Sequence, residues 1–299
     1  MTTTAHIRTE VTALLIGFAL VLAASPATAS ALNGRTARQV VITYRAYDGR
    51  LSHAAVLVPS WYGTTRGPAL PLVISPHGRG LDGRANARRW GNLPGLGGFI
   101  VVNPDGEGSH VTLCSWGARG QIDDLARMPQ IVHAALPWLQ IDPRRIYAVG
   151  GSMGGQETLL LLARYPRLLA GAVAVDPVVD FARQFRSATG ARGATLRRLA
   201  RDEVGGTPST NPGSYAARSP ITYAAAIASS GVPLQIWWTR TDRIVVHSQL
   251  QSGLLVKRIR ALDPGAPLTE VVGNWNHTEA LRADRSLPAM LVGLGLLEA

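Results

Sequence analysis

The stretch that most constrains this chain is residues 144–165, RRIYAVGGSMGGQETLLLLARY. A short apolar run typical of a buried strand leads into a glycine-rich turn, and a leucine-rich segment with helical spacing follows. Gly150 and Gly154 flank Ser152 at the spacing of a nucleophile elbow, in which close packing and a strained serine backbone require small neighbours. The stretch predicts a nucleophilic serine at the tip of a sharp turn. A plain strand–helix turn with Ser152 as helix N-cap is the alternative.

Residues 1–29 have the pattern of a secretory signal peptide. Arg8 supplies a positive start, residues 11–24 are mostly apolar, and Ala27-Thr28-Ala29 fits a small-x-small cleavage site. We therefore expect a secreted protein, extracellular or in the cell envelope. An uncleaved membrane anchor is the alternative. No later stretch reaches eighteen apolar residues, so we expect no membrane span after signal cleavage.

Apolar runs and helical patterns alternate along residues 30–299, which we expect to form a single catalytic domain. The pattern predicts strands at 40–44, 54–58, 72–75, 99–102, 146–149, 172–175, 234–238 and 268–272, and helices at 121–139, after Ser152, at 245–259 and at 278–297. This order predicts an α/β fold with a mostly parallel, eight-stranded sheet and helices on both faces. The first two strands read as an antiparallel hairpin at the sheet edge, with Asp48-Gly49 as the turn.

Residues 181–231 interrupt this alternation. The segment holds several arginines and the loop GGTPSTNPG, and it precedes the strand expected at 234–238. We interpret it as an insertion with one or two helices and a loop. Two positions are compatible with the pattern, a lid over the site and a peripheral decoration.

A serine nucleophile needs a histidine base and a carboxylate that orients the imidazole. His247 and His277 follow Ser152, and His277 is the preferred base because it lies in a polar loop between a strand and the last helix. Asp242 follows the strand 234–238 and is the preferred acid. The carboxylates that compete with it are those of Asp176, at another strand end, and Asp180.

Acyl transfer also requires donors for the developing oxyanion. The backbone N–H of Met153 is expected to be one. Arg79 or Gly80, in the loop that follows the strand 72–75, is expected to supply the other. We interpret His77, in the same loop, as structural.

Composition excludes several classes of protein. The net charge is +11, but the arginines occur singly or in pairs, so nucleic-acid binding is not expected. Cys114 is the one cysteine and has no motif around it, which argues against disulfides and a thiol nucleophile. We find no metal-ligand cluster, phosphate loop or dinucleotide fingerprint, and expect no cofactor and no metal. Trp90, Trp116 and Trp275 are candidates either for a substrate pocket or for plain packing.

On these residues the chain resembles the α/β-hydrolase superfamily. The elbow at 150–155, GGSMGG, and the approach at 141–147, IDPRRIY, look like the catalytic domain of prolyl oligopeptidases (peptidase S9). The 77–80 loop lacks the tyrosine that those peptidases use at the oxyanion site. Its His-Gly pair is similar to secreted feruloyl and acetyl-xylan esterases and polyester depolymerases.

The resemblance implies a serine hydrolase with Ser152, His277 and Asp242 as a triad, acting through an acyl-enzyme on a small-molecule ester or peptide. A carbohydrate or polyester esterase without peptidase activity is one alternative. A catalytically silent binding protein on the same scaffold is another, and a lyase or haloperoxidase-like enzyme is a third.

Overall fold

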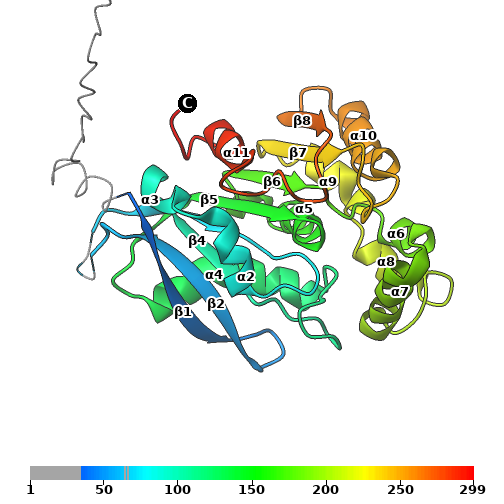
Figure 1. Ribbon diagram of the computed structural model, residues 1–299, viewed down its shortest axis with the longest axis horizontal. Helices are drawn as coiled ribbons and strands as arrows, with labels where there is room; N and C mark the ends of the chain where they lie inside the picture. The colour runs from blue at the N-terminus through cyan, green and yellow to red at the C-terminus, as the bar shows by residue number, and fades with distance from the viewer. Residues whose placement is uncertain (1–34, 64, 66) are drawn as a thin grey trace, which may run out of the picture.

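An eight-stranded sheet forms the centre of the protein (Figure 1). The computed structural model describes residues 35–63, 65 and 67–299, so the signal peptide expected at 1–29 lies outside the described residues. The strands are β1 (Ala37–Arg45), β2 (Leu51–Pro59), β3 (Leu70–Ile74), β4 (Ile100–Pro104), β5 (Ile141–Gly151), β6 (Gly171–Val175), β7 (Leu234–Thr239) and β8 (Leu268–Gly273). All eight strands predicted from the apolar runs are confirmed, and β5 begins earlier than expected.

The strand order is β1-β2-β4-β3-β5-β6-β7-β8. β1 pairs antiparallel with β2, β2 pairs antiparallel with β4, and every other neighbouring pair is parallel. The predicted edge hairpin is therefore confirmed, and Gly49 adopts a φ of 84° in its turn. Because β3 and β5 to β8 are parallel, their carboxyl ends lie along one edge of the sheet, where ligand sites of open α/β sheets form.

Helices cover both faces of the sheet, because strand side chains alternate between the faces. On β3, Leu72 and Ile74 pack into the larger core, whereas Val73 packs into the core on the other face. The larger core lies under α4 (Arg119–Ala135), α5 (Met153–Arg164), α9 (Ala224–Ala228) and α10 (Leu254–Leu262). The other face is covered by α2 (Gly83–Ala87), the 3₁₀ turn Arg88–Trp90, α3 (Leu93–Gly97) and α11 (Leu287–Gly293). No helix within the described ranges has the length and apolar character needed to cross a bilayer.

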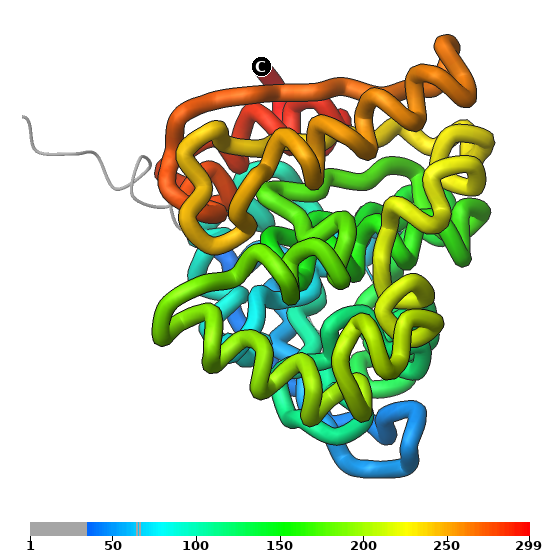
Figure 2. The backbone as a smooth tube through the Cα atoms, turned by 90° about the vertical axis from the view of Figure 1, so that its right-hand side faces the viewer, coloured from blue at the N-terminus to red at the C-terminus, as the bar shows by residue number. Residues whose placement is uncertain are grey.

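The insertion holds more helices than the one or two expected. It comprises α6 (Phe181–Ser187), α7 (Gly190–Val204), α8 (Pro212–Ala217), the 3₁₀ turn Pro220–Tyr223 and α9. Figure 2 views the molecule from the side on which α6 to α8 lie. A third apolar cluster, which includes Trp116, Met153, Phe181 and Tyr215, joins the insertion to the elbow helix.

Buried Glu203 on α7 fastens the insertion to the loop that contains residues 109–111. Its carboxylate accepts the backbone N–H groups of Ser109 (2.8 Å), His110 (2.8 Å) and Val111 (3.0 Å). It also pairs at 2.9 Å with Arg218, whose guanidinium donates in addition to the carbonyl of Ser115 (2.7 Å). A buried carboxylate with this many partners is held firmly.

Two helix predictions need correction. The helix expected at 278–297 is limited to α11, because Thr278 has a φ of 55° and the chain runs through turns before Pro288 in the first turn of α11. The helix expected at 245–259 starts later, with a π-helical turn at Gln249–Gly253 that leads into α10. His247 has a φ of 58°, which no helix residue adopts.

Candidate active site

Ser152 stands at a strained turn between β5 and α5. Its φ and ψ are 59° and −121°, a conformation that side chains other than glycine rarely adopt. Its N–H donates to the carbonyl of Val175 on β6 at 2.9 Å, which fixes the turn to the sheet. A Cβ on Gly154 would overlap the carbonyl oxygen of Pro76 and lie 3.0 Å from that of His77. The strand, strained serine and crowded glycine are the features that the elbow motif predicts.

The parallel strands bring the predicted residues to one edge of the sheet. Ser152 follows β5, Asp176 follows β6, Asp242 lies three residues after β7, and His277 lies four residues after β8. Arg79 follows β3, the neighbour of β5 on the other side. Residues far apart in sequence therefore meet because their strands are adjacent and end together.

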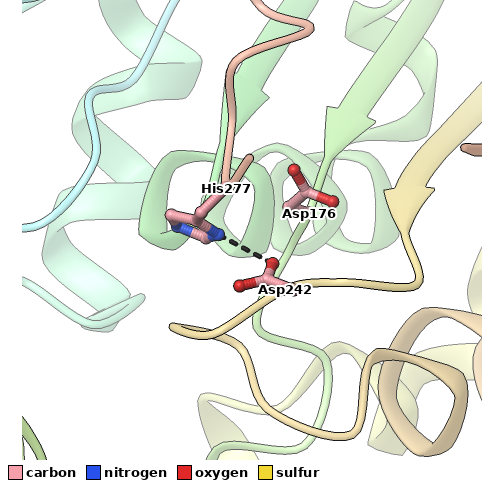
Figure 3. A group of neighbouring side chains, drawn as sticks. All are labelled: Asp176, Asp242 and His277. Atoms are coloured by element: carbon pink, nitrogen blue, oxygen red, sulfur yellow. Dashed lines mark hydrogen bonds and ion pairs between the residues drawn. The ribbon is translucent and has the colours of Figure 1, made fainter. Parts of the chain in front are cut away.

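His277 and Asp242 are directly hydrogen-bonded. Nδ1 of His277 lies 2.8 Å from Oδ2 of Asp242, as Figure 3 shows. The other oxygen of Asp242 accepts the N–H groups of Ile244 (2.7 Å) and Val245 (2.9 Å). The Asp242 side chain is 0% exposed and that of His277 is 17% exposed. The carboxylate is thus fixed in place and the imidazole keeps access to the cleft.

Asp176 is a second buried carboxylate beside this pair (Figure 3). Oδ1 accepts the N–H of Thr239 at 2.8 Å, and Oδ2 accepts the N–H of Thr278 at 2.8 Å and Nε1 of Trp275 at 3.1 Å. Burial raises the pKa of Asp176, the negative charge of Asp242 adds to the rise, and the hydrogen bond from Thr278 opposes it. The Asp176 carboxylate thus positions the backbone next to His277. Its place at a strand end in the sequence does not indicate this role.

One ligand atom from each of Asp176, Asp242 and His277 lies within 4.8 Å of the others, and this is the one such group in the described ranges. Three N–H groups already occupy Asp176, and Asp242 accepts two N–H groups besides its contact with His277. Because both carboxylates already accept N–H donors, the group is suited to orienting the imidazole rather than to binding a cation.

Ser152 and His277 line the same cavity, which has a volume of about 240 Å³. Gly78, Arg79 and Arg89 also line it, together with apolar Leu81, Ile244 and Leu281. The cavity is therefore a mixed polar and apolar cleft with two guanidinium groups on its walls.

The structure bears differently on the residues that were predicted to supply the two oxyanion donors. Met153 is the first residue of α5, where backbone N–H groups lack partners within the helix. Arg79 lines the cavity. Gly80 needs correction, because it is exposed and its N–H donates to the carbonyl of Leu113 at 3.2 Å. In this conformation Arg79 remains the candidate for the second donor.

The other residues singled out from the sequence serve packing or capping. Each ring nitrogen of buried His77 lies against a backbone carbonyl, those of Gly78 and Asp105. Asp180 caps α6 by accepting the N–H of Arg183, and His247 is exposed outside the cleft. Cys114 is buried, and burial raises the pKa of its thiol.

The three tryptophans do not line the cavity of Ser152. Trp90 is buried against Phe99, Trp116 stacks on Phe181 at 4.8 Å between ring centres, and Trp275 donates to Asp176. The packing interpretation therefore holds for all three.

Sequence reasoning missed the buried glutamates Glu157 and Glu203 behind the cleft. Glu157 lies on α5 and accepts the hydroxyl of Ser115, and burial raises its pKa to about 7. A glutamate within the leucine-rich stretch 157–162 was the available signal, because a carboxyl group on an apolar helix face needs a buried partner.

Comparison with known proteins identifies the family of the chain. The model of the prolyl oligopeptidase family (peptidase S9) matches residues 96–252, more than half of the chain, including the elbow and Asp242. The chain belongs to the prolyl oligopeptidase family. The α/β-hydrolase fold predicted from the sequence is thereby confirmed, and the protein is a serine hydrolase. No curated protein sequence matches the chain.

Solved structures of several hydrolases share the fold. A puromycin-hydrolyzing peptidase from Mycobacterium tuberculosis is 20% identical with a TM-score of 0.68, covering 88% of this chain and 39% of that one. The serine hydrolase FphF from Staphylococcus aureus is 15% identical with a TM-score of 0.66, covering 88% of this chain and all of that one. The S-formylglutathione hydrolase FrmB from the same organism is 18% identical with a TM-score of 0.62, covering 86% and 98%.

Proposed function

We propose that this prolyl oligopeptidase family member hydrolyses esters through an acyl-enzyme on Ser152, with His277 as base and Asp242 as its orienting carboxylate. One observation carries the proposal. The hydrogen-bonded His277–Asp242 pair and the strained elbow serine line or border a single cleft at the carboxyl edge of the sheet. This is the constellation that acyl transfer by serine requires.

Each residue has a defined step. Ser152 Oγ attacks the carbonyl carbon while His277 removes its proton, and Asp242 holds Nδ1 protonated so that Nε2 is the base. The N–H groups of Met153 and Arg79 stabilise the negative oxygen. The imidazolium returns the proton to the leaving group, and water then releases the acid by the same steps in reverse.

Chemistry favours esters as the main substrates, because an alkoxide leaves more readily than an amine anion. The second candidate is cleavage of peptide or amide bonds. Membership of a peptidase family supports it, as does the fold shared with a puromycin-hydrolyzing peptidase.

A paired assay tests the proposal. The full chain and Ser152→Ala are given p-nitrophenyl esters of short and long acids and aminoacyl p-nitroanilides, with Ser209→Ala in an exposed loop as matched control. We expect ester turnover in the wild type and the control, and a loss of about 10³-fold or more in Ser152→Ala. Comparable kcat/KM on anilides would establish the peptidase. Equal activity of Ser152→Ala and wild type would refute the serine mechanism, and no turnover by the wild type on any substrate would favour a binding protein.

We also propose that residues 1–29 direct export and are removed. The amino-terminal sequence of the protein recovered from the culture medium or the cell envelope tests this. A mature chain that starts near Ser30 supports cleavage.

A further inference from the structure

Arg89 is a half-buried arginine in the wall of the cleft. It lies in the 3₁₀ turn after α2, and NH1 is 3.3 Å from Oγ1 and 3.5 Å from the carbonyl oxygen of Thr278, the residue after His277. Both contacts are made to neutral groups. The guanidinium is therefore positioned by hydrogen bonds that do not balance its charge.

Within the part of the chain that the structure describes, no carboxylate forms an ion pair with Arg89. Burial lowers the pKa of its guanidinium, and the positive charge of Arg282 acts in the same direction. A cation that loses hydration without gaining a counter-ion is costly to keep. An anion supplied by a ligand would remove that cost.

Arg89 lines two adjoining spaces. One is the cavity of Ser152 and His277, and the other is a hollow of about 520 Å³ lined by His277 and Arg282 but not by Ser152. The acidic residue in this hollow, Glu279, is already engaged by Asn276 and by Arg285 at 3.3 Å. Arg282 is likewise paired with Asp284 at 3.0 Å, whereas Arg88 and Arg89 form no ion pair among the described residues. The hollow is therefore a net cationic extension of the cleft on the side of the imidazole.

We propose that Arg89 binds a carboxylate on the leaving group of the substrate. The inference rests on the proposed function, in which His277 protonates the leaving-group oxygen. The part of the substrate attached to that oxygen then extends into the hollow that His277 lines. A planar guanidinium matches a carboxylate with two parallel hydrogen bonds, and the pair is stronger where water is partly excluded. The substrate class is thus esters whose alcohol or phenol portion is acidic.

Matched substrates test this class. The pair 4-acetoxybenzoate and its methyl ester differ in the charge of the leaving group, and release of acetate is followed for both. A second pair, the mono-p-nitrophenyl ester of glutarate and p-nitrophenyl butyrate, carries the charge on the acyl side. Hydrolysis of 4-acetoxybenzoate consumes one water and gives acetate, 4-hydroxybenzoate and one proton. For each pair the measured quantity is the ratio of kcat/KM for the charged ester to kcat/KM for the neutral ester.

Arg89→Met is compared with Arg89→Lys and, as matched control, with Arg84→Met at an exposed position of α2. We expect Arg89→Met to lower the ratio of the first pair by about tenfold or more, with a smaller loss in Arg89→Lys and none in Arg84→Met. Because each ratio is taken within one variant, a general loss of activity or folding cancels.

An unchanged ratio in Arg89→Met overturns the inference, as does a change confined to the acyl-side pair. In either case Ser152-dependent hydrolysis of the neutral esters leaves the proposed function intact. If the wild type hydrolyses none of the four esters, the proposed function fails and the inference fails with it.

Discussion

The backbone N–H of Thr278 donates a 2.8 Å hydrogen bond to Oδ2 of Asp176, although the two residues are 102 positions apart. The same carboxylate accepts the N–H of Thr239 at the end of β7. One buried side chain after β6 therefore holds both the strand that leads to Asp242 and the loop that carries His277. Its hydrogen bonds set the relative position of the acid and the base.

We expect Asp176→Asn to lower kcat/KM for esters by roughly 10- to 100-fold, because one N–H acceptor becomes a donor and the His277 loop shifts. Steady-state turnover of p-nitrophenyl esters measures the loss.

Asp142→Asn is the control for charge, since Asp142 lies at the opposite end of β5 from Ser152. It should leave kcat/KM unchanged. An unchanged kcat/KM in Asp176→Asn would contradict the positioning role of Asp176.

Gly154→Ala should destabilise the fold by about 1–3 kcal/mol and reduce esterase activity sharply. The new Cβ overlaps the carbonyl of Pro76, so the start of α5 must move away from the loop that carries Arg79. Urea unfolding and ester turnover measure the two effects. Gly213→Ala on α8 is the matched control, because nothing lies within 4 Å of its Cβ, and it should change stability by about 1 kcal/mol or less. Wild-type stability and activity in Gly154→Ala would show that the elbow tolerates a side chain.

Glu157 predicts a specific pH dependence of stability. Burial raises the pKa of Glu157 from its ordinary value of 4.5 to about 7, so between these values the folded chain keeps a proton that the unfolded chain releases. The free energy of unfolding should therefore fall across this range, by on the order of 3 kcal/mol from this group. Glu157→Gln should remove that fall, and urea unfolding at pH 4.5 and pH 8 measures it.

Exposed Glu298 provides the control, and Glu298→Gln should retain the wild-type pH dependence. Wild type and Glu157→Gln share every other titrating group, so the difference between these two proteins isolates the contribution of Glu157. An identical pH dependence in wild type and Glu157→Gln would mean that the carboxyl group is equally protonated in the folded and unfolded chains.

The strands of the sheet could be predicted from the sequence, because they are continuous apolar runs with turns between them. The order of serine, acid and base along the chain also predicts Asp242 and His277 as neighbours, since that order follows from strand order. The structure brings these two side chains into contact. Local pattern and long-range topology agree at these positions.

The rest depends on contacts that no local pattern encodes. The helix predicted from Thr278 fails because Thr278 has a φ of 55°, a conformation held by the hydrogen bond from its N–H to Asp176, which follows β6. The sequence does not distinguish Gly80 from Arg79 as the second oxyanion donor. In the structure, the N–H of Gly80 donates to the carbonyl of Leu113. Glu203 has an ordinary helical sequence context, and its burial follows from three N–H groups in a loop almost a hundred residues away.

The attachment of Glu203 to residues 109–111 has a consequence for anyone who builds chimeras from this family. Exchanging the insertion alone would strip the 109–111 loop of its acceptor and the carbonyl of Ser115 of its Arg218 donor. The neighbouring Leu113 would lose its support, and with it the partner of Gly80 beside the cleft. Segments 107–118 and 181–231 should therefore be exchanged together when chimeras are made between relatives.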